Sequence, residues 1–203
     1  MTWLFEPVTR TGVTTEITQR NQFENDDVNL CDSLVRESIQ NCLDASLHDH
    51  LSSICSDKPS DDKVVVSFRW VEPVDHQKFE DLFREQLDHA KSSGLNLEKV
   101  DFDNPRALII EDFGTTGLLG SVDEMDNEDF ANFWRRSGQS SKSGSKKGRH
   151  GLGKFVFPFT SSIGVFFGLT KRFDDKKLYL MGQSVLNVRK FQGKEYPPHG
   201  FYC

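Results

Sequence analysis

Hydrophobic and polar positions follow helical spacing in some segments of the chain and extended spacing in others. Residues 26–50 and residues 75–92 carry apolar side chains on one side of a helical projection, which predicts two amphipathic helices. Residues 64–70 are β-branched and aromatic and predict a strand, while residues 51–63 break the first helix. The apolar side chains are Leu30, Leu34, Ile39 and Leu43 in the first helix and Phe79, Leu82, Phe83, Leu87 and Ala90 in the second.

The second half of the chain changes from a strand pattern to a charged, glycine-rich stretch. Residues 106–110 form a short apolar run before Glu111 and Asp112, which predicts a buried strand ending at a site. Residues 121–130 are strongly acidic, whereas residues 135–154 are basic, contain no acid and predict a flexible loop. Residues 162–189 predict a hairpin. We expect an α/β fold in one domain over residues 1–203, serving as the N-terminal module of a longer protein.

Composition narrows the class of protein. The 203 residues have a net charge of −6, so the chain lacks the basic balance of a general nucleic-acid binder. Hydrophobic content is 36%, with 17 Phe, which favours a folded, aromatic core over disorder. The four cysteines (Cys31, Cys42, Cys55 and Cys203) have no metal-ligand spacing and predict free thiols in a reducing compartment.

The chain contains no apolar segment of the length that a membrane span requires. It also begins without the basic and apolar regions of a secretory signal. We therefore expect a cytoplasmic protein with no membrane partner.

The first candidate motif lies on the first predicted helix. At about 100° per residue, Glu37, Asn41 and Asp44 fall within an arc of roughly 60°, opposite much of the apolar stripe. One surface thus presents two carboxylates and a carboxamide. By itself, such a stripe is typical of a solvated helix face.

Two glycine-containing motifs follow. Asp112 ends an apolar strand and precedes Gly114 and Gly117, so an acceptor lies beside backbone that a flat ligand can approach closely. Residues 148–154 offer backbone amides and cations to phosphate. They match the letters of a P-loop, but Phe155 replaces the hydroxyl residue that holds Mg²⁺, and no apolar strand precedes Gly148. A turn and a linker are the plain alternatives for these two motifs.

In this order, the three motifs resemble the nucleotide-binding signatures of the GHKL superfamily of gyrase-type, heat-shock-chaperone, mismatch-repair and histidine-kinase ATPases. Within it, the chain is most similar to microrchidia-like and chaperone-like members. The resemblance covers residues 29–182. Glu37, Asn41 and Asp44 correspond to the N box, Asp112 and Gly114 open the adenine box, and the glycine box of the ATP lid comprises Gly148, Gly151 and Gly153.

The resemblance implies a Bergerat fold, which is a two-layer α/β sandwich whose mixed sheet has helices on one face. It implies a lid over residues 114–154 and the cofactors ATP and Mg²⁺. Asn41 would bind Mg²⁺ and Glu37 would act as the general base. Asp112 would accept the adenine amino proton, with Gly114 and Gly117 beside the base. The other lid residues that would contact ATP are Lys142, Gly148, Gly151, Leu152, Gly153 and Lys154.

Two departures from the family pattern and several alternatives remain. Gly117 comes one residue later than in the usual adenine box, and Pro158 is expected to shorten or kink the helix after the lid.

We expect an ATPase that forms an ATP-dependent homodimer and drives a downstream effector domain or partner protein. Nucleic acid would bind only through regions outside this chain. The alternatives are a non-hydrolysing nucleotide sensor and a histidine kinase catalytic domain, although no room for a phosphoacceptor helix pair precedes Glu37.

Overall fold

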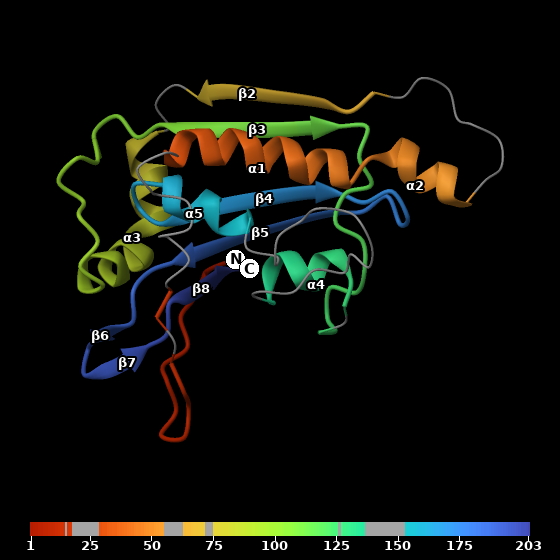
Figure 1. The fold of residues 1–203 in the computed structure, drawn as a ribbon. Helices are drawn as coiled ribbons and strands as arrows, with labels where there is room; N and C mark the ends of the chain where they lie inside the picture. The colour runs from red at the N-terminus through yellow and green to blue at the C-terminus, as the bar shows by residue number, and fades with distance from the viewer. Residues whose placement is uncertain (15, 18–28, 55–62, 72–74, 126, 137–152) are drawn as a thin grey trace.

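The computed structural model describes residues 1–14, 16–17, 29–54, 63–71, 75–125, 127–136 and 153–203, and shows a mixed α/β protein (Figure 1). Its helices are α1 (Leu30–Asp44), α2 (Leu47–Ile54), α3 (His76–Ser92), α4 (Asp129–Trp134), the 3-10 turn η2 (Gly153–Phe155) and α5 (Val156–Thr160). Its strands are β1 (Trp3–Leu4), β2 (Val65–Val71), β3 (Ala107–Phe113), β4 (Val165–Lys171), β5 (Leu178–Val185), β6 (Arg189–Phe191), β7 (Lys194–Tyr196) and β8 (His199–Tyr202). None of these helices is long and apolar enough to cross a membrane.

The described strands form three antiparallel sheets. The largest has the order β1-β8-β5-β4, and the others are the ladders β2-β3 and β6-β7. The mixed sheet that the resemblance implies is therefore not seen among the described residues. The hairpin expected over residues 162–189 is confirmed as β4 and β5.

Helices pack on both faces of the four-stranded sheet, whereas the resemblance implies helices on one face. Val165 of β4 belongs to the core cluster formed with Phe83 and Leu87 of α3. The next residue, Phe166, points to the opposite face and stacks on Trp134 of α4, with ring centroids 5.3 Å apart. The part of the sheet around Val165 and Phe166 is thus covered by α3 on one side and α4 on the other, whereas Leu169, Leu178 and Leu180 are exposed.

A second core cluster joins α1 to the segment that follows the predicted lid. Leu34 packs with Phe155, Val156 and Val185, and Leu108 and Ile110 of β3 pack against the same cluster. Helix α5 ends at Thr160 after five residues, in agreement with the shortening that Pro158 predicts. This cluster places the N-box helix, β3 and η2 around one apolar centre.

The helix predicted over residues 26–50 is divided in two, because Ala45 caps α1 and Ser46 forms a bridge with Thr115. Residues 26–28 lie outside the described part. The buried face of α1 also differs from the prediction, since Ile39 and Leu43 are exposed while Ser38 and Cys42 are buried. Contact with α5 and η2, rather than the distribution of apolar residues, determines which face is covered.

The second predicted helix is confirmed closely. α3 begins after the N-cap Asp75, whose carboxylate accepts a hydrogen bond from the Lys78 amide, and Gly94 follows it in a left-handed conformation with φ of 77°. Phe83, Leu87 and Ala90 are buried as the pattern predicts.

We predict that Gly168→Ala lowers the free energy of unfolding by about 1–3 kcal/mol, because a Cβ at this position would lie 2.7 Å from Cζ2 of Trp134. Chemical denaturation measures the change. As a control, Leu169→Val, at a side chain that is 68% exposed, should change stability by less than about 0.5 kcal/mol. Equal stability of the Gly168 variant and the parent would contradict the close packing of β4 on α4.

Candidate functional site

Helix α1 positions the three N-box side chains. It begins after Asn29, whose side chain accepts a hydrogen bond from the Asp32 amide as an N-cap. Its buried face contacts η2 and α5, so Glu37 and Asn41 lie at the boundary between this contact and solvent. Asp44, near the end of the helix, accepts a hydrogen bond of 2.9 Å from Gln40 Nε2.

Gly153 lies directly against the N box. A Cβ added to Gly153 would be 2.5 Å from Oε2 of Glu37 and 3.9 Å from Oδ1 of Asn41. A side chain at residue 153 would displace the Glu37 carboxylate from its present position, so the last glycine of the predicted glycine box and the predicted N box share one surface. The other oxygen of Glu37 pairs with the guanidinium of Arg36 at 3.2 Å, in a contact that is open to solvent.

Asp112 is placed beside the same helix. It lies near the end of β3, is exposed, and accepts a short hydrogen bond from the hydroxyl of Thr115. Burial raises the pKa of the Cys42 thiol to about 11, and the negative charge of Asp112 adds to this shift. The carboxylate of the predicted adenine box is thus close enough to α1 to act electrostatically on it.

Backbone hydrogen bonds join the junction of α1 with α2 to the loop after β3. The amide of Leu47 donates to the carbonyl of Gly114, and the amide of Thr116 donates to the carbonyl of Ala45, both at 2.9 Å. The N box and the adenine box are therefore held in a fixed relation by main-chain bonds, which depend little on the identity of the side chains.

Gly114 and Gly117 both require glycine. Their φ angles are 76° and 69°, in the left-handed region. A Cβ would lie 2.5 Å from the carbonyl oxygen of Lys63 at Gly114 and 2.6 Å from that of Lys171 at Gly117. The late second glycine of the motif is thus demanded by close contact with β4.

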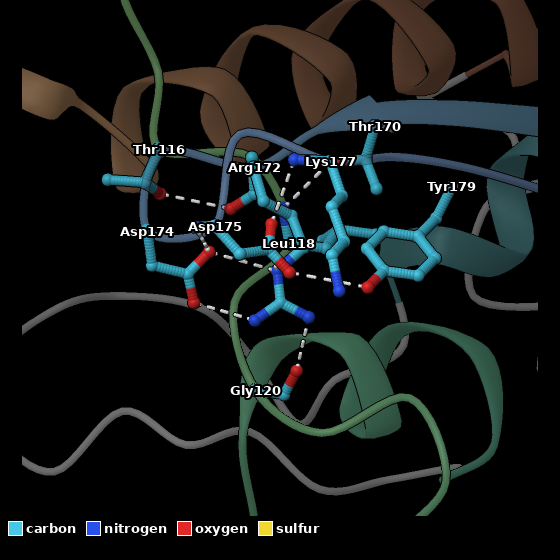
Figure 2. Close-up of polar contacts among 10 residues, drawn as sticks. Thr116, Leu118, Gly120, Thr170, Arg172, Asp174, Asp175, Lys177 and Tyr179 are labelled. Carbon is cyan, nitrogen blue, oxygen red and sulfur yellow. Dashed lines mark hydrogen bonds and ion pairs between the residues drawn. The ribbon is translucent and has the colours of Figure 1, made fainter.

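Arg172 anchors the segment that leaves the adenine box, as Figure 2 shows. Its side chain donates 2.6 Å hydrogen bonds to the carbonyl of Gly120 and to Oδ2 of Asp174, and a further bond of 3.0 Å to Oδ1 of Asp174. Oδ1 of Asp175 lies 3.6 Å from its Nε. These carboxylates raise the pKa of Arg172, and the guanidinium lowers the pKa of Asp174. The pair stays ionised and fixes Gly120 against the β4–β5 turn.

Two further hydrogen bonds fix this segment along β4 and the turn that follows it (Figure 2). Leu118 donates its amide to the hydroxyl of Thr170 at 3.0 Å, and Thr116 accepts a bond of 2.8 Å from the amide of Phe173. Neither Thr170 nor Arg172 belongs to a motif that the sequence marks. Only the predicted hairpin around Asp174 and Asp175 lies near them in the sequence. A local sequence pattern does not show these contacts, because each joins residues 52 positions apart.

Lys154 has an unexpected set of partners. It is buried, and its ammonium donates to the carbonyls of Asn132 and Arg136 at 3.1 and 2.7 Å. Burial lowers its pKa to about 8. In this structure Lys154 ties η2 to the end of α4 and does not face Glu37 or Asn41 as a free cation.

The remaining predicted lid residues, Lys142, Gly148, Gly151 and Leu152, lie outside the described residues, as does Cys55. Within the described residues, no group of three or more His, Cys, Asp or Glu side chains could hold a metal ion. Asn41 by itself offers one amide oxygen. That arrangement suits Mg²⁺ bound through one or two protein ligands together with phosphate and water.

We predict that Arg172→Lys makes the amides of Leu118 and Phe173 exchange with solvent about tenfold faster. A lysine cannot reproduce the forked contact with Asp174 and Gly120, and each hydrogen bond with a charged donor contributes about 1.5–3 kcal/mol. Hydrogen exchange followed by NMR measures the effect. Arg84→Lys, in an exposed pair with Asp81, is the matched control and should leave these amides unchanged. Unchanged exchange in the Arg172 variant would show that the guanidinium does not anchor this segment.

Comparisons of the chain with protein-family models, with curated proteins and with solved structures found no match. The resemblance of its three motifs to the GHKL signatures therefore remains a prediction from the sequence.

Proposed function

We propose that this chain binds ATP with Mg²⁺ and hydrolyses it, as a GHKL-type module. One observation carries the proposal: three motifs far apart in the sequence converge. Gly153 lies against Glu37 and Asn41, and the loop that contains Gly114 is hydrogen-bonded to the end of the same helix. A P-loop or an unrelated turn would not require these three segments to meet.

Each converging residue has one role in the proposal. Asn41 supplies its amide oxygen to Mg²⁺, which neutralises phosphate charge when bound. Glu37, one helical turn earlier, accepts a proton from the attacking water. Asp112 accepts a hydrogen bond from the adenine amino group, which guanine cannot provide at that position. Asp44 completes the polar end of the helix beside the base.

Glycine backbone forms the walls of the proposed site. Gly114 and Gly117 let the loop after Asp112 pack closely on the backbone of Lys63 and Lys171, and Gly153 lets η2 lie against Glu37. The lid over residues 114–154 rests on the resemblance. Lys154 is left out of the phosphate contacts, because its ammonium is already bonded to two carbonyls.

The Bergerat two-layer sandwich belongs to the same proposal. The motifs occur in its order on a helix, a strand end and a loop. ATP-dependent homodimerisation and a downstream effector complete the proposed function.

We predict that Asp112→Asn weakens binding of a non-hydrolysable ATP analogue by about tenfold to a hundredfold, because the amide group turns part of the required acceptor into a donor. Asn41→Ala should weaken binding only when Mg²⁺ is present. Isothermal titration calorimetry with and without Mg²⁺ measures both. Asp103→Asn, at an exposed acid outside the site, is the matched control. Unchanged affinity in Asp112→Asn would remove this residue from the adenine contact.

We predict that Glu37→Gln keeps nucleotide affinity within about threefold but lowers the hydrolysis rate by about a hundredfold or more, since a carboxamide cannot accept the proton of water. Phosphate release measures the rate, and calorimetry measures affinity on the same sample. Binding by the parent without any turnover would favour the non-hydrolysing sensor. Turnover of the variant at the parent rate would show that Glu37 is not the base.

A further inference from the structure

A cavity of about 410 Å³ lies between the N-terminal segment, α3, the β6–β7 hairpin and β8. None of the residues that line it belongs to the site described above. One wall is helix α3 and the other is built largely from aromatic rings. The composition of these two walls is specific enough to indicate a class of ligand.

The aromatic wall is a continuous series of rings. Trp3 lies 5.4 Å from Tyr202 and 6.0 Å from Phe5 between ring centroids, and Phe191 lies 6.4 Å from Tyr196. His89 connects the two groups, because it stacks on Phe5 at 4.0 Å and contacts Phe191 and Tyr196 at 4.5 and 4.7 Å. All six of these residues line the cavity.

The helix wall is acidic. Asp81, Glu85 and Asp88 line the cavity from α3 at positions i, i+4 and i+7, which share one helix face. Asp81 is paired with Arg84 at 3.0 Å, and Asp88 lies 3.9 Å from Lys91. Glu85 forms no ion pair with another described side chain, so its carboxylate is available to a ligand.

The positive groups nearest this wall pair with Asp81 and Asp88 and leave Glu85 without an ion pair to a described side chain. Burial lowers the pKa of His89 to about 4, so the ring is neutral at pH 7, and its Nδ1 accepts a hydrogen bond of 3.0 Å from Arg189 Nε. Arg189 is 3% exposed and does not line the cavity. Its guanidinium carbon lies 5.1 Å from the centre of the Phe5 ring, so this ring already stabilises one buried cation. Arg84 is the one lysine or arginine among the described lining residues, which also include the N-terminal residue Met1.

We propose that this cavity binds an organic ammonium ion, with the alkylated nitrogen against the aromatic wall and its charge opposite Glu85. Aromatic faces attract cations through their quadrupole, and alkyl groups on the nitrogen reduce the cost of removing the cation from water. Carboxylates beside the rings add direct charge complementarity. The ammonium belongs either to a free amine or to an alkylated lysine side chain of a peptide, which share this chemistry.

The test compares choline with 3,3-dimethylbutan-1-ol, which has the same shape but no charge. Each is titrated into the whole chain at constant ionic strength while NMR follows the amides around the cavity. We expect saturable shifts with choline and at least tenfold weaker binding of the neutral alcohol. Equal binding of the two compounds, or no saturable shift with choline, would overturn the proposal.

Variants locate the binding site. Glu85→Gln, at an exposed side chain, should weaken choline at least fivefold, whereas Glu80→Gln, on the same helix outside the cavity, should not. Tyr196→Leu removes a ring face and should weaken binding, while Tyr196→Phe keeps the face and should bind as the parent does. Equal affinity in all four variants would contradict the assignment to this cavity.

A second titration identifies the source of the ammonium. A short peptide that contains trimethyl-lysine is compared with the same peptide containing its uncharged carbon isostere. Preference for the charged peptide over choline would indicate a protein partner, and the reverse preference would indicate a free amine. Both results support the proposed chemistry, and loss of the preference for charge in both titrations would refute it.

Discussion

Two main-chain hydrogen bonds between the junction of α1 with α2 and the loop after β3 hold the candidate site together. They join Leu47 to Gly114 and Ala45 to Thr116. Because they use backbone groups, they fix the distance between the N-box helix and Asp112 regardless of most substitutions. They also end α1 at Ala45, which explains why one long predicted helix became two. Together with the core cluster around Leu34 and Phe155, this junction gives the three motifs a shared frame.

Close backbone contacts keep this junction in place. Gly114 approaches the carbonyl of Lys63 and Gly117 that of Lys171, each at a distance that excludes a Cβ. Arg172 then connects the segment beyond Gly117 to the β4–β5 turn through the carbonyl of Gly120. The hydrogen bonds of Arg172 and the close contacts of these glycines thus fix the position of the loop that the proposed nucleotide would contact.

The two proposed binding regions use different chemistry because they border different parts of the core. The candidate nucleotide site lies where α1 meets η2 and the loop after β3, so it is rich in carboxylate, amide and bare backbone. The cavity beside α3 borders the aromatic cluster around Trp3 and Phe83, so its walls are rings and helix carboxylates. The many phenylalanines of the chain thus serve core packing in both regions and line the second directly.

The sequence by itself determined the local elements and the candidate chemistry. The apolar spacing of α3 and its cap at Asp75 are properties of neighbouring residues, and so are the β4–β5 hairpin and the strand around Asp112. The burial predicted for that strand was wrong, because β3 runs on to Phe113 and all its residues are half-buried or exposed. Tertiary structure decided which face of α1 is buried, that Lys154 bonds to carbonyls of α4, and that Thr170 and Arg172 anchor a loop some fifty residues away. Those outcomes depend on contacts between distant segments, which periodicity along one segment does not encode.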